Sequence, residues 1–115
     1  PWGLTAKYVD DPTPEGFAAV VSAKTKLVWV ESPTNPLLQV IDIAAVADVA
    51  NKAGATFVVD NTFASPYLQQ PLKLGAELGV HSTTKYLGGH SGVVGGAVIG
   101  GKDWMDQIKC FQNAA

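Results

Sequence analysis

The chain has 115 residues, 47% of them hydrophobic and 16% charged, which is the composition of one globular domain with a buried core and not of a disordered segment. A net charge of −2, with eight lysines and no arginine, argues against a nucleic-acid partner or an anionic membrane surface. The single cysteine, Cys110, excludes an internal disulfide and indicates a reducing, cytoplasmic compartment, and no apolar run reaches the roughly 18 residues of a membrane span.

The first third of the chain is expected to contain a strand, a helix and a second strand. Residues 6–9 form the short first strand, and residues 14–23 form a helix, because proline is favoured in the first helical turn. Residues 27–31, LVWVE, are β-branched and aromatic and predict a buried strand. The prolines of SPTNP, at 32–36, end that strand.

The following helix has clear signals at both ends. Asp42 is a suitable N-cap, the helix extends to Lys52, and Gly54 stops it. Residues 56–60, TFVVD, then predict a second buried strand. The apolar residues of the helix share one face, and they are Ile43, Val46, Val49 and Ala50.

The second half of the chain is expected to contain two more strands and a helix. Residues 61–71 are interpreted as a loop that accommodates a helical turn. The third strand covers residues 78–82, the fourth covers residues 93–100, and the final helix covers residues 103–111.

The order of these elements predicts an α/β fold. Strand–helix–strand spacing is typical of parallel strands joined by right-handed crossovers, and strands that are apolar on both faces need helices on both sides of the sheet. Only ten residues, 83–92, separate the last two strands, which is short for a helical crossover. We therefore expect a mostly parallel sheet with helices on both faces and one antiparallel strand, the fourth.

Three polar residues end or follow the buried strands at intervals of 25 residues: Asn35, Asp60 and Lys85. In open α/β sheets, ligands bind outside the carboxyl ends of the strands, so these side chains are expected to face one crevice. A carboxylate at the end of a buried strand is costly unless a cation pairs with it. A reactive lysine must act as the neutral amine, which a partly buried setting favours.

The sequence HSTTKYLGGHSG, at 81–92, surrounds Lys85 with hydroxyls and glycines. Ser82 and Thr84 are suited to hold a phosphate, together with the backbone amides of the turn. Pyridoxal phosphate satisfies all of these groups at once, because its aldehyde reacts with the lysine, its phosphate binds the hydroxyls and its protonated ring nitrogen pairs with Asp60.

Three segments of the chain resemble the Cys/Met metabolism family of pyridoxal-phosphate enzymes: ESPTNP at 31–36, VVDNTFASPYLQQPLKLGAE at 58–77 and HSTTKYLGGHSGVVGG at 81–96. The family includes cystathionine γ-synthases and γ-lyases, methionine γ-lyases and O-acetylhomoserine sulfhydrylases. The resemblance implies that residues 1–115 are a part of the large cofactor domain of a fold-type-I enzyme, without a complete second domain. It also implies a cytoplasmic homotetramer in which neighbouring subunits complete the site.

The same resemblance implies a role for each candidate site residue. Lys85 carries the cofactor as a Schiff base and is the catalytic residue, Asp60 pairs with the ring nitrogen, and the phosphate is held by Ser82 and Thr84. Asn35 contacts the phenolic oxygen of the cofactor, and Thr62 lies near the cofactor ring. No metal site is implied.

The reaction that the resemblance implies is elimination or replacement at the γ-carbon of cystathionine or of an activated homoserine, as in transsulfuration. O-acetylhomoserine sulfhydrylase and methionine γ-lyase are alternatives within the family. The partner is then an amino-acid substrate, with no role for nucleic acid or membrane. Three positions depart from the usual family pattern: Gly92 replaces an aspartate, Gly79 an apolar residue and Gln70 an arginine.

Two other classes of protein compete with this interpretation. A hydrolase is suggested by GHSGV, at 89–93, with Ser91 as its nucleophile, but Val93 replaces the last glycine and the nucleophile elbow requires a helix after the turn. A non-catalytic nucleotide-binding module is the other alternative. It leaves both Asp60 and Lys85 without a role, and the glycines lack the lysine and hydroxyl of a P-loop.

Overall fold

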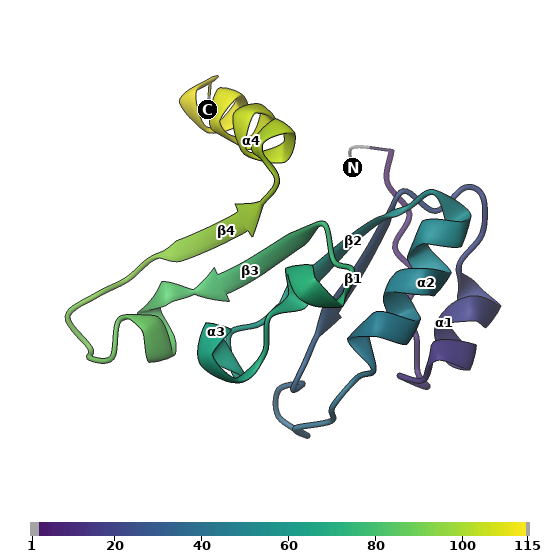
Figure 1. Ribbon diagram of the computed structural model, residues 1–115, viewed down its shortest axis with the longest axis horizontal. Coiled ribbons are helices and arrows are strands. Elements are labelled where there is room, and N and C mark those ends of the chain that lie inside the picture. Colours follow the sequence, from purple (N-terminus) through teal and green to yellow (C-terminus); the bar gives the residue numbers. More distant parts are fainter. Residues whose placement is uncertain (1–2, 115) are drawn as a thin grey trace.

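The computed structural model describes residues 3–114 and shows a twisted sheet with helices packed against it (Figure 1). Within these residues, no helix is long and apolar enough to cross a membrane. In chain order the elements are α1 (Pro14–Val20), β1 (Leu27–Glu31), α2 (Ile43–Ala53), β2 (Thr56–Asp60), α3 (Ser65–Leu68), the 3₁₀ turn η1 (Pro71–Leu74), β3 (Leu78–Ser82), the π-helical turn η2 (Thr83–Leu87), β4 (Gly96–Gly100) and α4 (Lys102–Ala114).

The four strands form one sheet in the order β1-β2-β3-β4. The pairs β1–β2 and β2–β3 are parallel, and β3–β4 is antiparallel. The expected α/β fold with a mostly parallel sheet and one antiparallel strand is therefore confirmed. Its physical basis is the length of the connections, because the segment between β3 and β4 is too short to cross over the sheet.

The ends of α2 are where the sequence predicts them. Asp42 caps the helix by accepting the N–H of Ala45 at 3.0 Å, and Gly54 ends it in the left-handed conformation with φ of 67°. The preceding helix, α1, is shorter than expected and ends at Val20. Its N-cap is Thr13, whose hydroxyl accepts the N–H of Gly16 at 3.1 Å.

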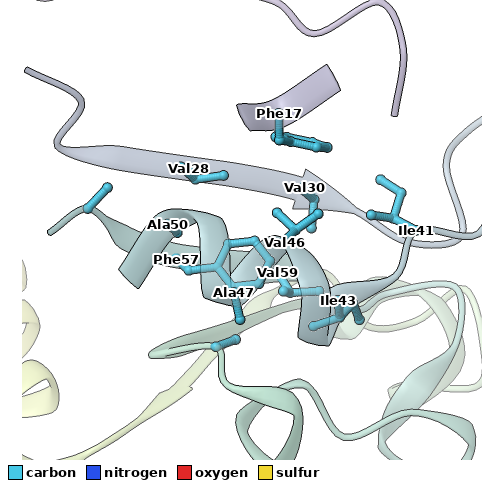
Figure 2. Packing of buried hydrophobic residues seen from close by; sticks show 12 residues of the cluster. Phe17, Val28, Val30, Ile41, Ile43, Val46, Ala47, Ala50, Phe57 and Val59 are labelled. Atoms are coloured by element: carbon cyan, nitrogen blue, oxygen red, sulfur yellow. The ribbon is translucent and has the colours of Figure 1, made fainter. Parts of the chain in front are cut away.

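The hydrophobic core lies between α1 and α2 and one face of β1 and β2. Figure 2 shows side chains from these elements pointing toward one another. Phe57 and Val46 are fully buried at its centre, and truncating an aromatic core residue such as Phe57 to alanine costs about 3–5 kcal/mol. The cluster consists of Phe17, Val28, Val30, Ile41, Ile43, Val46, Ala47, Ala50, Ala55, Phe57, Val59 and Ala76.

The opposite face of β1 is open within residues 3–114. Leu27 and Trp29 alternate with the core residues of this strand, and each remains 53% exposed. The helical cover expected on both faces is thus present on only one face of β1, because α1 and α2 both pack on the side of the core. The uncovered side is the face that also carries Asp60, since β1 and β2 are in register.

Three further expectations, besides the end of α1, were wrong. Residues 6–9 form no strand, and they run exposed or half-buried ahead of α1. The fourth strand begins at Gly96 and not at residue 93, because the carbonyl of Gly95 accepts the N–H of Thr83 at 2.9 Å and so belongs to the turn. The last helix is longer than expected and covers Lys102–Ala114.

Candidate active site at the carboxyl ends of the parallel strands

Asp60 ends β2, and its carboxylate is fixed by the loop that follows. Its backbone pairs with Glu31 on one side and Val80 on the other, so the ends of β1 and β2 lie side by side and β3 extends two residues further, to Ser82. Its side chain is half-buried, and its Oδ1 accepts the backbone N–H of Thr62 at 3.0 Å. This hydrogen bond orients the carboxylate at the edge of the sheet where the sequence predicts a ligand.

Thr62 connects this carboxylate to the next strand. The threonine is buried, and its Oγ1 accepts the backbone N–H of Ser82 at 2.8 Å. Ser82 is the last residue of β3 and precedes the turn that contains Lys85. Three of the predicted site residues, Asp60, Thr62 and Ser82, are therefore joined by a continuous path of two hydrogen bonds.

Lys85 lies in the π-helical turn η2, which is interrupted at the lysine itself, with φ of −90° and ψ of −120°. The turn is closed by Gly88, whose N–H donates to Thr83 O at 2.7 Å, and by Gly89, whose N–H donates to Lys85 O at 3.0 Å. The lysine is exposed. The expected partial burial is thus wrong for residues 3–114, because η2 projects beyond the end of β3 and no helix of this segment covers it.

Thr84 holds this turn against the chain that returns to the sheet. Its Oγ1 accepts the N–H of Gly95 at 2.9 Å, and the hydroxyl also lies 3.3 Å from Gly95 O. An aromatic contact adds to this attachment, since the rings of Phe63 and Tyr86 lie 6.3 Å apart at an angle of 40°. The turn is therefore fixed at its base, whereas the lysine side chain remains free of the packing.

Asn35 lies in the exposed loop that follows β1. Thr34 shapes this loop, because its N–H donates to Gln39 O at 2.9 Å and its Oγ1 accepts the N–H of Gln39 at 3.0 Å. The loop leaves β1 beside the end of β2. Asn35 is consequently on the same edge of the sheet as Asp60, although its side chain is not part of the Asp60–Thr62–Ser82 path.

A buried amide network, formed by Ser32, Asn61 and Gln69, lies directly under this edge. Ser32 and Asn61 are 0% exposed. The Nε2 of Gln69 donates to Ser32 O at 2.9 Å and to Asn61 Oδ1 at 2.8 Å, and Asn61 Nδ2 donates to Gln69 O at 2.8 Å. None of these three residues was predicted from the sequence to belong to the site. The only signal was Asn61 itself, an amide placed next to Asp60 at the end of a buried strand.

His81 precedes Ser82 and faces the other side of the sheet. It is 4% exposed, and its Nδ1 has no hydrogen-bond partner among residues 3–114. Burial lowers the pKa of His81, and the negative charge of Asp60 partly opposes this effect. The histidine lines a mainly apolar hollow of about 210 Å³ together with Gln69, Leu72 and Ile99, and this hollow contains none of the six predicted site residues.

Ser91 does not have the surroundings of a hydrolase nucleophile. It lies in an exposed turn, and the next regular element is the strand β4. His90 is next to it in sequence, but its Nδ1 accepts the N–H of Gly92 at 3.0 Å. Since a nucleophile elbow joins a strand to a helix, the hydrolase interpretation is wrong on structural grounds.

Two solved structures share the fold of this chain. The chain is similar to a metB structure from Corynebacterium glutamicum, with 56% identity and a TM-score of 0.86 over 92% of this chain and 28% of that one. It is also similar to apo CalE6, a methionine gamma lyase from Micromonospora echinospora, with 46% identity and a TM-score of 0.91 over 97% of this chain and 31% of that one.

Curated sequences give the same picture. A probable cystathionine gamma-synthase of Herpetosiphon aurantiacus is 50% identical over 98% of this chain and 36% of its own length. A cystathionine gamma-lyase of Bacillus subtilis is 46% identical over 97% of this chain and 30% of its own length. The profile of the Cys/Met metabolism PLP-dependent enzymes matches residues 1–115. The chain belongs to this family, and it spans about a third of the length of these relatives.

The residues present fit the pyridoxal phosphate that defines the family. The half-buried carboxylate of Asp60 is suited to pair with a cationic ring nitrogen, and the neighbouring strand provides the hydroxyl of Ser82. The amine of Lys85 is exposed on the same edge of the sheet. The alternative of a non-catalytic nucleotide-binding module is excluded, because the family is one of PLP-dependent enzymes.

Proposed function

We propose that this chain is the central part of the large, cofactor-binding domain of a longer pyridoxal-phosphate enzyme that acts on sulfur amino acids. The observation that carries the proposal is the path of hydrogen bonds from Asp60 through Thr62 to Ser82, which continues along the chain into the turn of Lys85. A carboxylate, hydroxyls and a lysine amine are thereby gathered at the ligand-binding edge of an α/β sheet.

Each residue has a defined task in this proposal. When bound, the cofactor supplies an electron sink for negative charge that develops next to the amino nitrogen of the substrate. Asp60 keeps the ring nitrogen protonated, which makes the sink stronger. Ser82 and Thr84 bind the phosphate, and Asn35 binds the phenolic oxygen. Thr62 lies near the ring and sets the direction of the carboxylate.

Lys85 has two tasks. It would hold the cofactor covalently, and its amine would serve as the base that takes the proton from Cα of an amino-acid substrate and moves protons to Cβ. This second task requires a mobile lysine side chain. Its exposure supports that mobility, and so does the pair of glycines, Gly88 and Gly89, that follows the turn.

The proposed reaction is elimination or replacement at the γ-carbon of cystathionine or an activated homoserine. It is supported by the names of the relatives, which are cystathionine gamma-synthases and gamma-lyases. Methionine γ-lyase and O-acetylhomoserine sulfhydrylase are alternatives in the same family. A cystathionine beta-lyase of Coxiella burnetii, 45% identical over 97% of this chain, adds elimination at the β-carbon to the reactions that the assay must cover.

The proposal extends to assembly and location. The family resemblance supports a homotetramer, and the single cysteine supports a cytoplasmic protein, since no pair is present for a disulfide. Analytical ultracentrifugation of the full-length enzyme tests the first point. A monomer at micromolar concentration would contradict it.

Borohydride reduction of the full-length enzyme followed by peptide mapping tests the function. We expect a yellow protein that is bleached by the reagent and carries the reduced cofactor on Lys85. A label on another lysine of this chain, such as Lys73 or Lys102, would refute the assignment. Assays with cystathionine, with methionine and with O-succinylhomoserine plus cysteine then identify the reaction. Transamination of these substrates with no release of ammonia and no formation of a thioether would exclude γ-chemistry.

A further inference from the structure

Gln69 joins segments that are distant in sequence. Its side-chain amide donates to Ser32 O at 2.9 Å, at the end of β1, and to Asn61 Oδ1 at 2.8 Å, at the end of β2. Its own backbone carbonyl accepts the N–H of Asn61 Nδ2 at 2.8 Å. Both hydrogens of one primary amide are therefore used, and they connect the ends of the first two parallel strands.

Ser32 connects this network to the loop that contains Asn35. The Oγ of Ser32 accepts the N–H of Ile41 at 3.1 Å, which closes the loop 32–41 at its base. The N–H of Ser32 donates to Asp60 O at 3.2 Å. The position of this loop relative to the end of β2 thus depends on hydrogen bonds made by a single fully buried serine.

The donors of Gln69 are difficult to replace. Ser32 and Asn61 are completely buried, so both acceptors lose a hydrogen-bond partner inside the protein if the amide is lost. Unpaired buried acceptors are costly, and we expect the loop 32–41 to move away from the end of β2 in response. Such a displacement changes the distance between Asn35 and the site of Asp60.

We propose that Gln69 is a positioning residue of the cofactor site. It holds the loop 32–41, and with it Asn35, against the end of the strand that carries Asp60. The inference rests on the proposed function, in which Asn35 binds the phenolic oxygen of the cofactor and Asp60 its ring nitrogen. Gln69 acts through Ser32 and Asn61 and does not itself touch the cofactor.

The test uses the full-length enzyme with the variant Gln69→Met, which keeps the length of the side chain and removes both donors. The matched control is Gln70→Met, because Gln70 is the exposed neighbour and donates only to Pro66 O at 3.3 Å. Titration of the apoenzyme with pyridoxal phosphate measures affinity. We expect Gln69→Met to weaken cofactor binding roughly tenfold, which corresponds to the loss of one buried hydrogen bond between uncharged groups. Gln70→Met should leave the cofactor affinity unchanged.

The second readout is the midpoint of the pH titration of the visible absorbance of the bound cofactor. A molecule that has unfolded loses this absorbance, so the midpoint does not respond to a simple loss of stability. An amide that donates to the phenolic oxygen lowers this midpoint by drawing charge from the oxygen. Asn35→Ala is therefore expected to raise it, and Gln69→Met should raise it too, with less than additive effects in the double variant.

An unchanged midpoint in Gln69→Met, with Asn35→Ala shifted, would overturn the positioning role and leave the proposed function intact. Absence of bound cofactor in the unmodified enzyme would instead refute the proposed function. If Gln69→Met does not fold, Gln69→Asn keeps the amide on a side chain one methylene too short to reach both Ser32 O and Asn61 Oδ1, and it is expected to raise the midpoint in the same way. A folded Gln69→Asn enzyme with an unchanged midpoint would also overturn the inference.

Discussion

The hydroxyl oxygen of Thr62 accepts the backbone N–H of Ser82 at 2.8 Å, and this bond ties the end of β2 to the end of β3. The same threonine donates its own N–H to Asp60 at 3.0 Å. One buried residue therefore sets the relative position of the group proposed for the ring nitrogen and the group proposed for the phosphate.

Replacing Thr62 by valine removes the acceptor while keeping the shape of the side chain. The N–H of Ser82 is then left unpaired at a half-buried position, so we expect unfolding in urea to become about 1–2 kcal/mol easier and the affinity for pyridoxal phosphate to fall. Thr62→Ser retains the hydroxyl and is the matched control, with binding close to that of the unmodified enzyme. Equal loss in the serine and valine variants would show that the methyl group, and not the hydrogen bond, is responsible.

Asp60→Asn separates the charge of this residue from its role in the loop. The amide oxygen of asparagine still accepts the N–H of Thr62, so the fold and some cofactor binding are retained. The negative charge that keeps the ring nitrogen protonated is lost, and we expect kcat to fall by about 10²-fold or more. Steady-state assays at a saturating concentration of cofactor measure this effect. Turnover near that of the unmodified enzyme would contradict the role of Asp60.

Local signals were sufficient for the elements that frame the site. Asp42 and Gly54 mark the ends of α2 in sequence and in structure, since capping depends on neighbouring residues only. The carboxyl ends of the strands could likewise be predicted, because Asp60 directly follows an apolar run. The short connection after Ser82 was enough to predict the antiparallel pair.

The buried amide network could not be predicted in this way. Ser32 and Gln69 are 37 residues apart, and no local pattern indicates that a glutamine in a polar loop is to meet a serine at the end of a distant strand. The start of β4 was missed for a similar reason, because the carbonyl of Gly95 is taken by Thr83 and Thr84 in a turn that the apolar run does not reveal. Pairing between distant polar groups is decided by the assembled sheet.

The buried histidine predicts a pH-dependent stability. Burial lowers the pKa of His81 below its ordinary value of 6.5, so the folded chain excludes a proton that the unfolded chain accepts. Stability is then complete above about pH 6.5 and decreases as the pH falls below it, by at most about 1.4 kcal/mol per pH unit for one proton. Urea unfolding at several pH values measures the free energy of unfolding. As the pH falls, this free energy should decrease less steeply in His81→Leu than in the unmodified enzyme. His90→Asn replaces an exposed histidine and is the control; equal slopes in all three proteins would contradict this account.

Gly79 has room for a side chain. An added Cβ meets Leu72 Cδ1 at 3.4 Å, which is an ordinary contact, and the glycine lies in β3 without a positive φ. Gly79→Ala is therefore expected to stabilise the enzyme by about 0.5–1 kcal/mol, because alanine loses less backbone entropy on folding. Gly75→Ala is the opposite case, since its φ is 99° and a Cβ lies 2.9 Å from Ala47 Cβ. In thermal unfolding, the melting temperature of Gly79→Ala should be higher than that of the unmodified enzyme, and the melting temperature of Gly75→Ala should be lower. The reverse order would refute the contact argument.

The uncovered face of β1 predicts how residues 1–115 behave when expressed alone. Leu27 and Trp29 are each 53% exposed on a sheet face, and an open apolar face of this kind promotes association. We expect the isolated segment to self-associate and to have no turnover, whereas Leu27→Lys together with Trp29→Lys should shift it toward the monomer. Sedimentation velocity at several concentrations measures the association. A matched double variant on α4, Gln107→Lys with Gln112→Lys, adds the same two positive charges at exposed positions and leaves the apolar face intact, so it should still associate. A monomeric unmodified segment with measurable activity would contradict both expectations.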